Sequence, residues 1–370
     1  MAEILLKNLA HSYSRDPQHA TDYAIHEMNH TWTQGGAYAL LGPSGCGKST
    51  LLNIISGLVK PSHGSVLFDG VKVNEISPQE RNIAQVFQFP VIYDSMSVYD
   101  NLAFPLRNMK VAESEIATRV AEVADILDLT EMLKRRASNL TADEKQKVSM
   151  GRGLVRDDVS AILFDEPLTV IDPNLKWKLR RKLKQIHERY NITMVYVTHD
   201  QLEASTFADK IALMYEGKIV QFGTPRELFE NPNHTFVGYF IGSPGMNLLS
   251  ADRSGDRLYF KGIELPLSNE QRALISTLTS ENIKFGIRPE FTQLSDIAHE
   301  DSLECQVEHT EDLGTYKIVT VSLAGEQLKV RLDEDQHPPS NTAYLNLPSQ
   351  WVKIYVDEYL VAPVEEQSND

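Results

Sequence analysis

Cysteine is scarce in this 370-residue sequence, which contains only Cys46 and Cys305. Two distant thiols provide neither a disulfide framework nor metal-ligand spacing, so we expect both to be free. Long apolar runs are also missing: no stretch of about 18 uncharged apolar residues occurs, and no segment is expected to cross a membrane by itself. The first residues, Met1 to Ile4, have no basic segment followed by an apolar stretch, which argues against export. These absences predict a cytoplasmic globular protein.

Positive charge is in short supply as well. The sequence has 36 Lys and Arg against 51 Asp and Glu, a formal net charge of −15. Most of the deficit lies in residues 241–370, where 10 basic residues face 22 acidic ones. This acidity argues against a nucleic-acid surface in that part of the chain. The acidic ending, residues 365–370, is expected to be disordered.

One stretch matches the phosphate-binding pattern G-x-x-x-x-G-K-[ST] at every fixed position. It consists of Gly42, Pro43, Ser44, Gly45, Cys46, Gly47, Lys48, Ser49 and Thr50. The apolar run 37–41 predicts a buried strand before it, and the apolar spacing over 51–58 predicts a helix after it. In that setting backbone N–H groups surround phosphate oxygens, Lys48 neutralises them and Ser49 can bind magnesium. The alternative, a glycine-rich turn that merely joins strand to helix, is disfavoured because the pattern and both flanking elements fit.

Two adjacent carboxylates end another predicted strand. The strand-like run 161–165 ends at Asp165, and Glu166 and Pro167 follow it. By itself this pair would indicate a turn. With a phosphate loop in the same chain, Asp165 can hold magnesium through water, while Glu166 orients or deprotonates the water that attacks phosphorus.

Three other side chains are candidates for the same site. Tyr13 could stack on a nucleotide base, although an aromatic ring near a strand is more often packed in a core. Gln88 ends a strand-like run, 83–88, and its carbonyl oxygen could bind the metal. His199 ends the strand-like run 194–198. A lone histidine is usually structural, but ligands lie at the carboxyl ends of parallel strands, which favours a contact with the terminal phosphate.

The segment from Phe89 to Pro105 is rich in aromatic residues and methionine for a connection. It contains Tyr93, Met96, Tyr99 and Phe104. Exposed side chains of this kind predict a docking site for a partner protein. The alternative is a loop packed onto its own core.

Helices are predicted farther along the chain. Apolar spacing indicates one over about 112–129 and an amphipathic one over about 174–190. Thr141 and Glu144 form a capping box, which predicts that another helix begins there.

Taken in order, these motifs resemble the ATP-binding subunit of an ABC transporter. Residues 42–50 resemble its Walker A loop, Gln88 its Q-loop, 161–166 its Walker B strand, Asp172 its D-loop, His199 its switch histidine and Tyr13 its adenine-stacking aromatic residue. The resemblance implies an α/β P-loop NTPase fold, with a RecA-like core and a helical subdomain. It also implies ATP and Mg²⁺ as cofactors, and Glu166 and His199 as catalytic residues.

The resemblance continues to the end of the chain. Residues 286–290 and 311–314 match the C-terminal regulatory domain of the maltose-importer type of ATPase. That type implies a nucleotide-binding domain over 1–240 and a β-rich, OB-like regulatory domain over 241–370. The short alternating stretches 317–321 and 327–332 agree with strands in the second domain.

One motif departs from the family pattern. The family's signature, Leu-Ser-Gly-Gly-Gln, binds the γ-phosphate held by the opposite subunit, but here it is replaced by Leu140, Thr141, Ala142, Asp143 and Glu144. Two carboxylates near phosphate oxygens predict repulsion of about 1 to 4 kcal/mol. We therefore expect a poor homodimer that needs a paralogous second ATPase subunit. The alternatives are that the loop shifts and still works, or that Lys145 or Lys147 compensates.

The stretches 139–156 and 162–172 are especially similar to one of the two ATPases of bacterial glycerol importers. This similarity implies glycerol import, with two transmembrane permease subunits, a periplasmic or extracellular substrate-binding protein, no nucleic-acid partner, and a peripheral location on the cytoplasmic face of the plasma membrane. Alternatives are an importer ATPase for another carbohydrate or for glycerol 3-phosphate, a non-transport ABC ATPase acting on DNA or ribosomes, and a regulatory module that captures a protein through residues 241–370.

Overall fold

The computed structural model describes residues 2–156, 158–299 and 301–361. Its contacts divide the chain into two compact units, Met1–Pro225 and Arg226–Asp370. This division falls before the expected boundary between residues 240 and 241. The predicted disorder of 365–370 lies outside the described residues. Within the described part, no helix is long and apolar enough to span a membrane, and both cysteines are free and buried.

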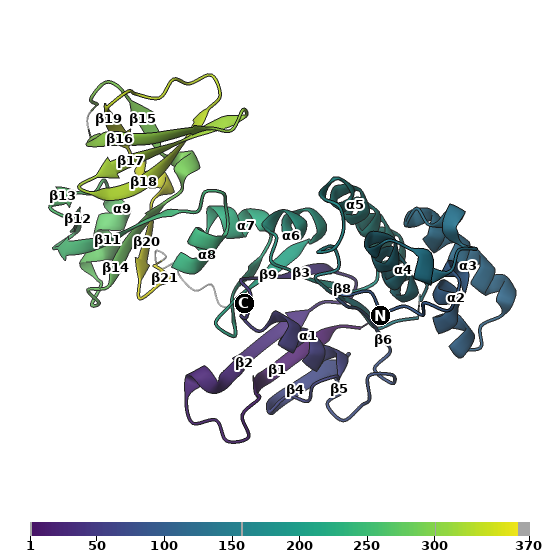
Figure 1. The fold of residues 1–370 in the computed structure, drawn as a ribbon. Helices are drawn as coiled ribbons and strands as arrows, with labels where there is room; N and C mark the ends of the chain where they lie inside the picture. The colour runs from purple at the N-terminus through teal and green to yellow at the C-terminus, as the bar shows by residue number, and fades with distance from the viewer. Residues whose placement is uncertain (1, 157, 300, 362–370) are drawn as a thin grey trace. The chain divides into compact units, whose positions relative to one another are not determined.

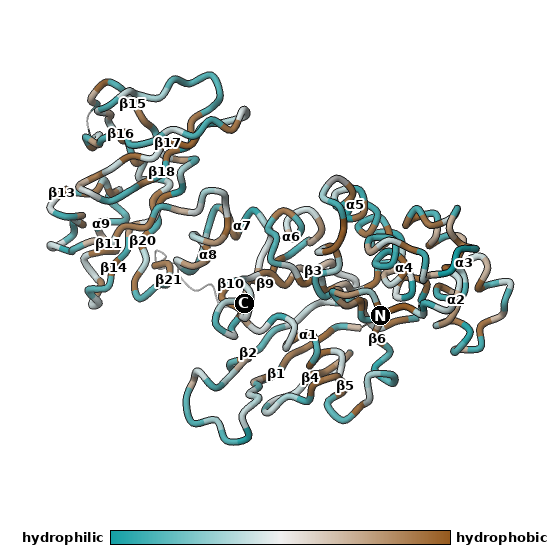
Figure 2. The backbone as a smooth tube through the Cα atoms, in the orientation of Figure 1, coloured by the Kyte–Doolittle hydropathy of each residue, from teal (hydrophilic) through white to brown (hydrophobic). Residues whose placement is uncertain are grey.

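A six-stranded sheet forms the centre of the first unit (Figure 1). Its order is β10 (Lys218–Gly223), β9 (Lys210–Tyr215), β3 (Ala37–Leu41), β8 (Met194–Thr198), β7 (Ala161–Asp165) and β6 (Ile83–Val86). The strands from β9 to β6 are parallel, and β10 is antiparallel at the edge. Both β3 and β8 are buried throughout because helices lie on both sides of the sheet, and the tube coloured by hydropathy is brown along β3 (Figure 2).

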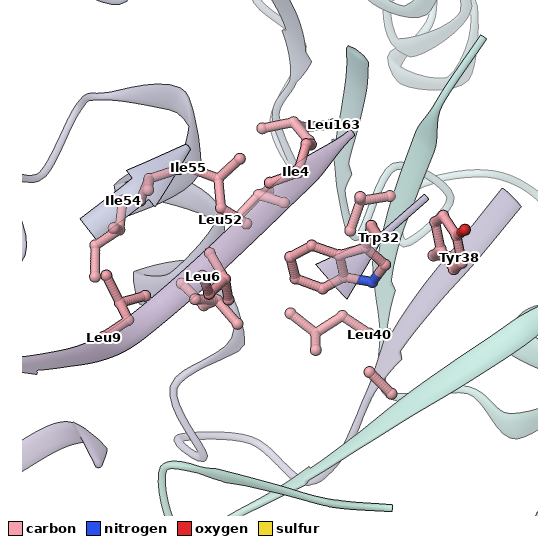
Figure 3. Packing of buried hydrophobic residues seen from close by; sticks show 14 of the residues in the cluster. Ile4, Leu6, Leu9, Trp32, Tyr38, Leu40, Leu52, Ile54, Ile55 and Leu163 are labelled. Carbon is pink, nitrogen blue, oxygen red and sulfur yellow. The ribbon is translucent and has the colours of Figure 1, made fainter. Parts of the chain in front are cut away.

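A second, antiparallel sheet covers the first helix. It contains β2 (Tyr23–Trp32), β1 (Ile4–Ser12), β4 (His63–Phe68) and β5 (Val71–Lys72). Helix α1 (Lys48–Ser56) shares one core with both sheets, in which β1 contributes Leu6 and Leu9, α1 contributes Leu52 and Ile55, and β7 contributes Leu163 (Figure 3). The predicted strand and helix around residues 42–50 are therefore confirmed as β3 and α1, and α1 shares its core with both sheets.

The remaining helices of this unit are α2 (Val98–Asn108), α3 (Glu113–Ile126), α4 (Ala142–Leu154), α5 (Pro173–Tyr190) and α6 (Gln201–Phe207), with short 3-10 turns at Ala20–Asp22, Thr130–Met132 and Ala137–Asn139. The helices predicted over 112–129 and 174–190 are confirmed as α3 and α5. The segment 89–105 is not one loop, because its second half belongs to α2. Val98 and Leu102 are buried there, so apolar side chains that looked like loop residues form a helix face.

The second unit is rich in strands, as expected. It begins within α7 (Pro225–Glu230) and continues with α8 (Thr235–Phe240). One sheet contains β13 (Ile263–Glu264), β12 (Arg257–Phe260), β11 (Asn247–Ser254), β14 (Ile283–Ile287), β20 (Lys353–Val356) and β21 (Tyr359–Leu360). The other contains β15 (Gln293–Ser295), β19 (Thr342–Asn346), β16 (Leu303–Asp312), β17 (Tyr316–Leu323) and β18 (Glu326–Asp333). The two sheets share a single hydrophobic core, to which α9 (Asn269–Ser276) adds Ile275.

A buried arginine explains why α7 and α8 belong to the second unit. Arg288 follows β14 and is 1% exposed. Its guanidinium donates to the carbonyl of Phe229 at 2.6 Å, and to those of Gly238 and Ile241. It also lies over the Phe229 ring, with its Cζ 4.2 Å from the ring centroid. Burial lowers the pKa of Arg288 to about 10, so it stays charged at neutral pH.

Replacing this arginine should release residues 226–241 from the β-rich core. Arg288→Met leaves at least three carbonyls without their donor, and we expect it to lower the free energy of unfolding of this unit by about 3 kcal/mol or more. Amide hydrogen exchange and limited proteolysis of the full-length chain should then show faster exchange and cleavage at 226–241. The control is Arg257→Met, which removes a half-exposed arginine paired with Glu264. Equal protection in both variants would contradict this role.

Candidate active site

The loop between β3 and α1 has a backbone that only glycine fits at two points. Gly47 precedes α1 with φ 102°, and a Cβ there would lie 2.6 Å from the carbonyl oxygen of Ala24. A Cβ on Gly42 would lie 2.3 Å from the carbonyl oxygen of Met214. The chain therefore passes close to its neighbours at both glycines, and the loop leads directly into the N-terminus of α1, the end of a helix that binds anions.

Lys48 and Ser49 begin α1 and point into this loop region. Lys48 is buried, and its Nζ donates to the carbonyls of Gly42 at 2.9 Å and Pro43 at 2.8 Å. The Ser49 hydroxyl donates to Asp165 Oδ1 at 3.0 Å. Burial raises the pKa of Asp165, and the neighbouring Glu166 charge adds to the shift, while the Ser49 hydrogen bond opposes it. A cation bound here would favour the ionised carboxylate.

The Ser49 and Asp165 oxygens fit a hard cation such as Mg²⁺. No group of three or more His, Cys, Asp or Glu side chains that could hold a metal ion occurs in the described ranges. A magnesium ion at this place would therefore take its remaining ligands from substrate phosphates and water, which is how Mg²⁺ is commonly held.

Glu166 and His199 meet at the same edge of the sheet. The backbone N–H of Glu166 donates to the carbonyl of Val197 at 3.0 Å, which joins the end of β7 to β8. Glu166 Oε2 lies 3.1 Å from His199 Nδ1. Glu166 has φ 46°, a conformation that non-glycine residues rarely adopt and that is concentrated at functional sites. Its carboxylate is thus aimed by a strained turn and held by an imidazole.

Tyr13 lies beside the phosphate loop rather than in a core. Tyr13 is 66% exposed, and its hydroxyl is 3.1 Å from Thr50 Oγ1. The ring of His11 supports it edge-on, at 4.6 Å between centroids. The core-packed alternative is therefore wrong, and stacking on the adenine stays a prediction.

Gln88 and Asp172 are located by the backbone of the elements next to them. Gln88 follows β6, which pairs with β7 so that Val86 lies opposite Phe164. It therefore comes to the same sheet edge, but no hydrogen bond to Ser49 or Asp165 is seen among the described residues, and its metal role stays a prediction. The carbonyl of Asp172 accepts the N–H groups of Leu175 and Lys176 in the first turn of α5.

The capping box at α4 is confirmed. Thr141 N–H donates to Glu144 Oε2 at 2.8 Å, and Thr141 Oγ1 accepts the N–H of Glu144. The Thr141 hydroxyl also donates to the Asp143 carboxylate. Glu144 is therefore turned back onto its own helix end, and the Lys145 ammonium pairs with Asp94 at 2.9 Å.

Sequence patterns missed Gln146 in the same helix. It is fully buried, and its Nε2 donates to the carbonyls of Phe87 at 3.1 Å and Pro167 at 3.0 Å. These carbonyls lie next to Gln88 and Glu166, so Gln146 holds both loops to the start of α4. A polar residue on the inward face of a helix was the available signal.

Comparisons with known proteins agree with this geometry. Residues 25–169 match the ABC transporter family, 242–291 the MalK OB fold domain and 285–344 the TOBE domain. The chain therefore belongs to the ATP-binding proteins of ABC transporters, and it is an ATPase. Its added OB and TOBE domains are those of the maltose-importer type.

Individual relatives place the chain more narrowly. It is 39% identical over 320 residues to the sn-glycerol-3-phosphate import ATP-binding protein UgpC of Bordetella avium, covering 86% of this chain and 85% of that one. It is 43% identical to the trehalose import ATP-binding protein SugC of Mycobacterium tuberculosis, covering 79% and 73%. The structure of cbiO1 from Clostridium perfringens matches with a TM-score of 0.56 and 28% identity, over 62% of this chain and 90% of that one.

Glu166→Gln should preserve ATP binding and lower ATP hydrolysis by at least about a hundredfold, because an amide cannot take a proton from water. Turnover and the affinity for a fluorescent ATP analogue are measured on the same full-length protein. Lys48→Ala serves as the contrasting variant, since loss of the loop ammonium should weaken binding itself. Near wild-type turnover by Glu166→Gln would remove this carboxylate from the mechanism.

Proposed function

We propose that this chain is the ATP-hydrolysing subunit of an importer for glycerol, with Glu166 as the residue that activates water. The observation that carries the proposal is the meeting of two pairs, Ser49 with Asp165 and Glu166 with His199, at one edge of a parallel sheet. The first pair joins the helix that follows the phosphate loop to the end of β7. The second supplies a carboxylate and an imidazole that can orient a water molecule and receive its proton.

Each residue has a distinct task in this proposal. The loop N–H groups and Lys48 bind the phosphates, and Tyr13 stacks on the adenine. Ser49 and Asp165, with Gln88, hold Mg²⁺, which when bound neutralises charge on the phosphate oxygens. Glu166 holds the attacking water, and His199 keeps that carboxylate in place and contacts the terminal phosphate.

The exposed apolar surface formed by Phe89 and Val91, in the segment after β6, is proposed to receive a helix of a membrane permease subunit. Phe89 is 71% and Val91 53% exposed. Behind them Arg152 lies over the Tyr93 ring at 4.7 Å and donates to the Val91 carbonyl at 2.5 Å. Exposed apolar side chains on a backbone that is braced in this way favour docking over packing onto the chain's own core.

A cleft of about 470 Å³ lies close by. It is lined by Ser95, Met96, Ser97, Asp100, Phe104, Arg107, Lys134 and Arg136. A permease helix seated there would place the chain on the cytoplasmic face of the plasma membrane, with two permease subunits and an extracellular or periplasmic substrate-binding protein completing the transporter.

Glycerol is proposed from the similarity of residues 139–156 and 162–172 to one ATPase of glycerol importers. The names of the relatives, which concern sn-glycerol 3-phosphate and trehalose import, support the wider class of sugars and glycerol derivatives. Sn-glycerol 3-phosphate is therefore the second candidate. The substrate does not touch an ATPase subunit in this arrangement, so transport has to be measured.

Uptake of labelled glycerol, sn-glycerol 3-phosphate and trehalose should be compared in cells that lack the chromosomal copy and carry wild-type protein or Glu166→Gln. We expect glycerol uptake to depend on the wild-type chain and to be lost with Glu166→Gln. Dependence of only sn-glycerol 3-phosphate or trehalose uptake would correct the substrate. If the uptake of none of the three solutes depended on the wild-type chain, the proposal that this protein serves an importer would be wrong.

Phe89→Asp tests the docking surface in the same cells. It should abolish uptake, because a charge replaces an exposed apolar contact, while the purified protein keeps its ATP affinity. Lys110→Asp, in the turn after α2, is the exposed control. Normal uptake with Phe89→Asp would favour a surface without a partner.

A paralogous second ATPase subunit is also part of the proposal. The charges of Asp143 and Glu144 remain at the N-terminus of α4, although Glu144 accepts a hydrogen bond from the N–H of Thr141 and Asp143 accepts one from the Thr141 hydroxyl. Replacing Ala142, Asp143 and Glu144 by Gly, Gly and Gln should raise the ATPase activity of the isolated protein severalfold, about 3- to 10-fold, by removing repulsion at the opposite γ-phosphate. Turnover at saturating magnesium is compared after checks of folding and dimer formation. Equal activity would remove the physical reason for a paralogue.

A further inference from the structure

A buried carboxylate outside the proposed chemistry joins three elements of the first unit. Glu203, in α6, is 3% exposed. Its Oε2 accepts hydrogen bonds from the hydroxyls of Tyr196 and Thr198, each at 3.0 Å. Its Oε1 accepts one from Lys176 Nζ at 3.1 Å. Strand β8, helix α6 and helix α5 therefore meet at one charged side chain whose two oxygens are both satisfied.

The contacts with β8 hold the turn that carries His199. Thr198 Oγ1 donates to Glu203 and accepts the N–H of Asp200 at 3.0 Å. Asp200 Oδ1 in turn accepts the N–H of Glu203 at 3.0 Å and caps α6. His199 thus lies between two residues that are bonded to Glu203, and its Nδ1 reaches Glu166.

The contact with α5 reaches the loop of Asp172. Lys176 lies in the first turn of α5, where its N–H donates to the Asp172 carbonyl at 3.1 Å. The side chains of Lys176 and Glu203 are 24% and 5% exposed. Water and salt therefore screen their attraction only weakly, and a shift of either loop would separate an ion pair in a poorly solvated place.

We propose that Glu203 is a positioning residue that ties the His199 turn to the Asp172 loop, so that both loops take their places for hydrolysis together. The proposal rests on the proposed role of His199 in ATP hydrolysis and on the resemblance of Asp172 to the D-loop of the family. A carboxylate suits the task because it accepts all three hydrogen bonds, whereas an amide would turn N–H groups toward one of the donors. Burial, with the Glu203 charge, raises the pKa of Tyr196 well above its ordinary value, so the phenol remains a donor.

The interaction between Glu203 and Lys176 can be removed by substituting either residue in the full-length chain. Glu203→Gln should lower kcat for ATP by about tenfold or more, while the ATP KM and the affinity for a fluorescent ATP analogue change by less than about twofold. Lys176→Met should lower kcat similarly. The double variant should be no slower than the slower single variant, because both changes remove one shared interaction.

The matched control is Lys182→Met in the same helix. Lys182 pairs with Asp128 at 2.6 Å, away from both loops, so its loss should leave kcat unchanged. Thermal unfolding of every variant gives the folded fraction used to normalise turnover. A wild-type kcat in Lys176→Met would overturn the positioning role of Glu203. So would reductions in kcat that multiply in the double variant, or reductions that disappear when turnover is normalised to the folded fraction.

His199→Ala and Glu166→Gln are measured in parallel to separate the two proposals. Normal ATP hydrolysis by both variants would overturn the proposed active site and, with it, the positioning role of Glu203. Loss of hydrolysis in both, with a normal kcat in Glu203→Gln, would overturn only the role of Glu203. The positioning role of Glu203 is supported if His199→Ala, Glu166→Gln and Glu203→Gln all lower ATP hydrolysis while Glu203→Gln keeps its nucleotide affinity.

Discussion

The register of the central parallel strands is the constraint on which the site depends. Leu41 lies opposite Thr198, and Val197 lies opposite Asp165, so β3, β8 and β7 end at the same edge. Parallel strands bring their carboxyl ends together, and the loops that leave those ends must then share one small region. The phosphate loop, the paired carboxylates and the histidine turn become neighbours for this reason, although about 150 residues separate the first from the last.

Buried polar side chains then set the positions of the loops. Gln146 holds the segments before Gln88 and after Glu166, and Glu203 contacts the histidine turn and the start of α5. In the second unit Arg288 plays a comparable part by binding carbonyls of the segment that enters it. An unpaired polar group inside a protein is costly, so moving one of these loops away would leave buried donors or acceptors without their partners.

Much of the site could be predicted because its chemistry is local. Residues 42–50 carry their pattern within nine positions, and Asp165 and Glu166 are adjacent. The capping box of Thr141 and Glu144 is likewise a short-range pattern, and the structure contains it. The second half of the segment 89–105 was predicted wrongly as a loop. Apolar residues such as Val98 and Leu102 can be exposed in a loop or buried on a helix face, and only their packing shows which of these applies.

The sequence by itself determined the fold class and the residue types that can bind phosphate and a hard cation, because these depend on hydrophobic periodicity and short motifs. Only the tertiary structure decided that Tyr13 is exposed beside Thr50, that Glu166 lies within reach of His199, and that α7 and α8 belong to the second unit. Those results depend on contacts between residues far apart in the chain, and no local pattern encodes which distant side chain fills a buried place.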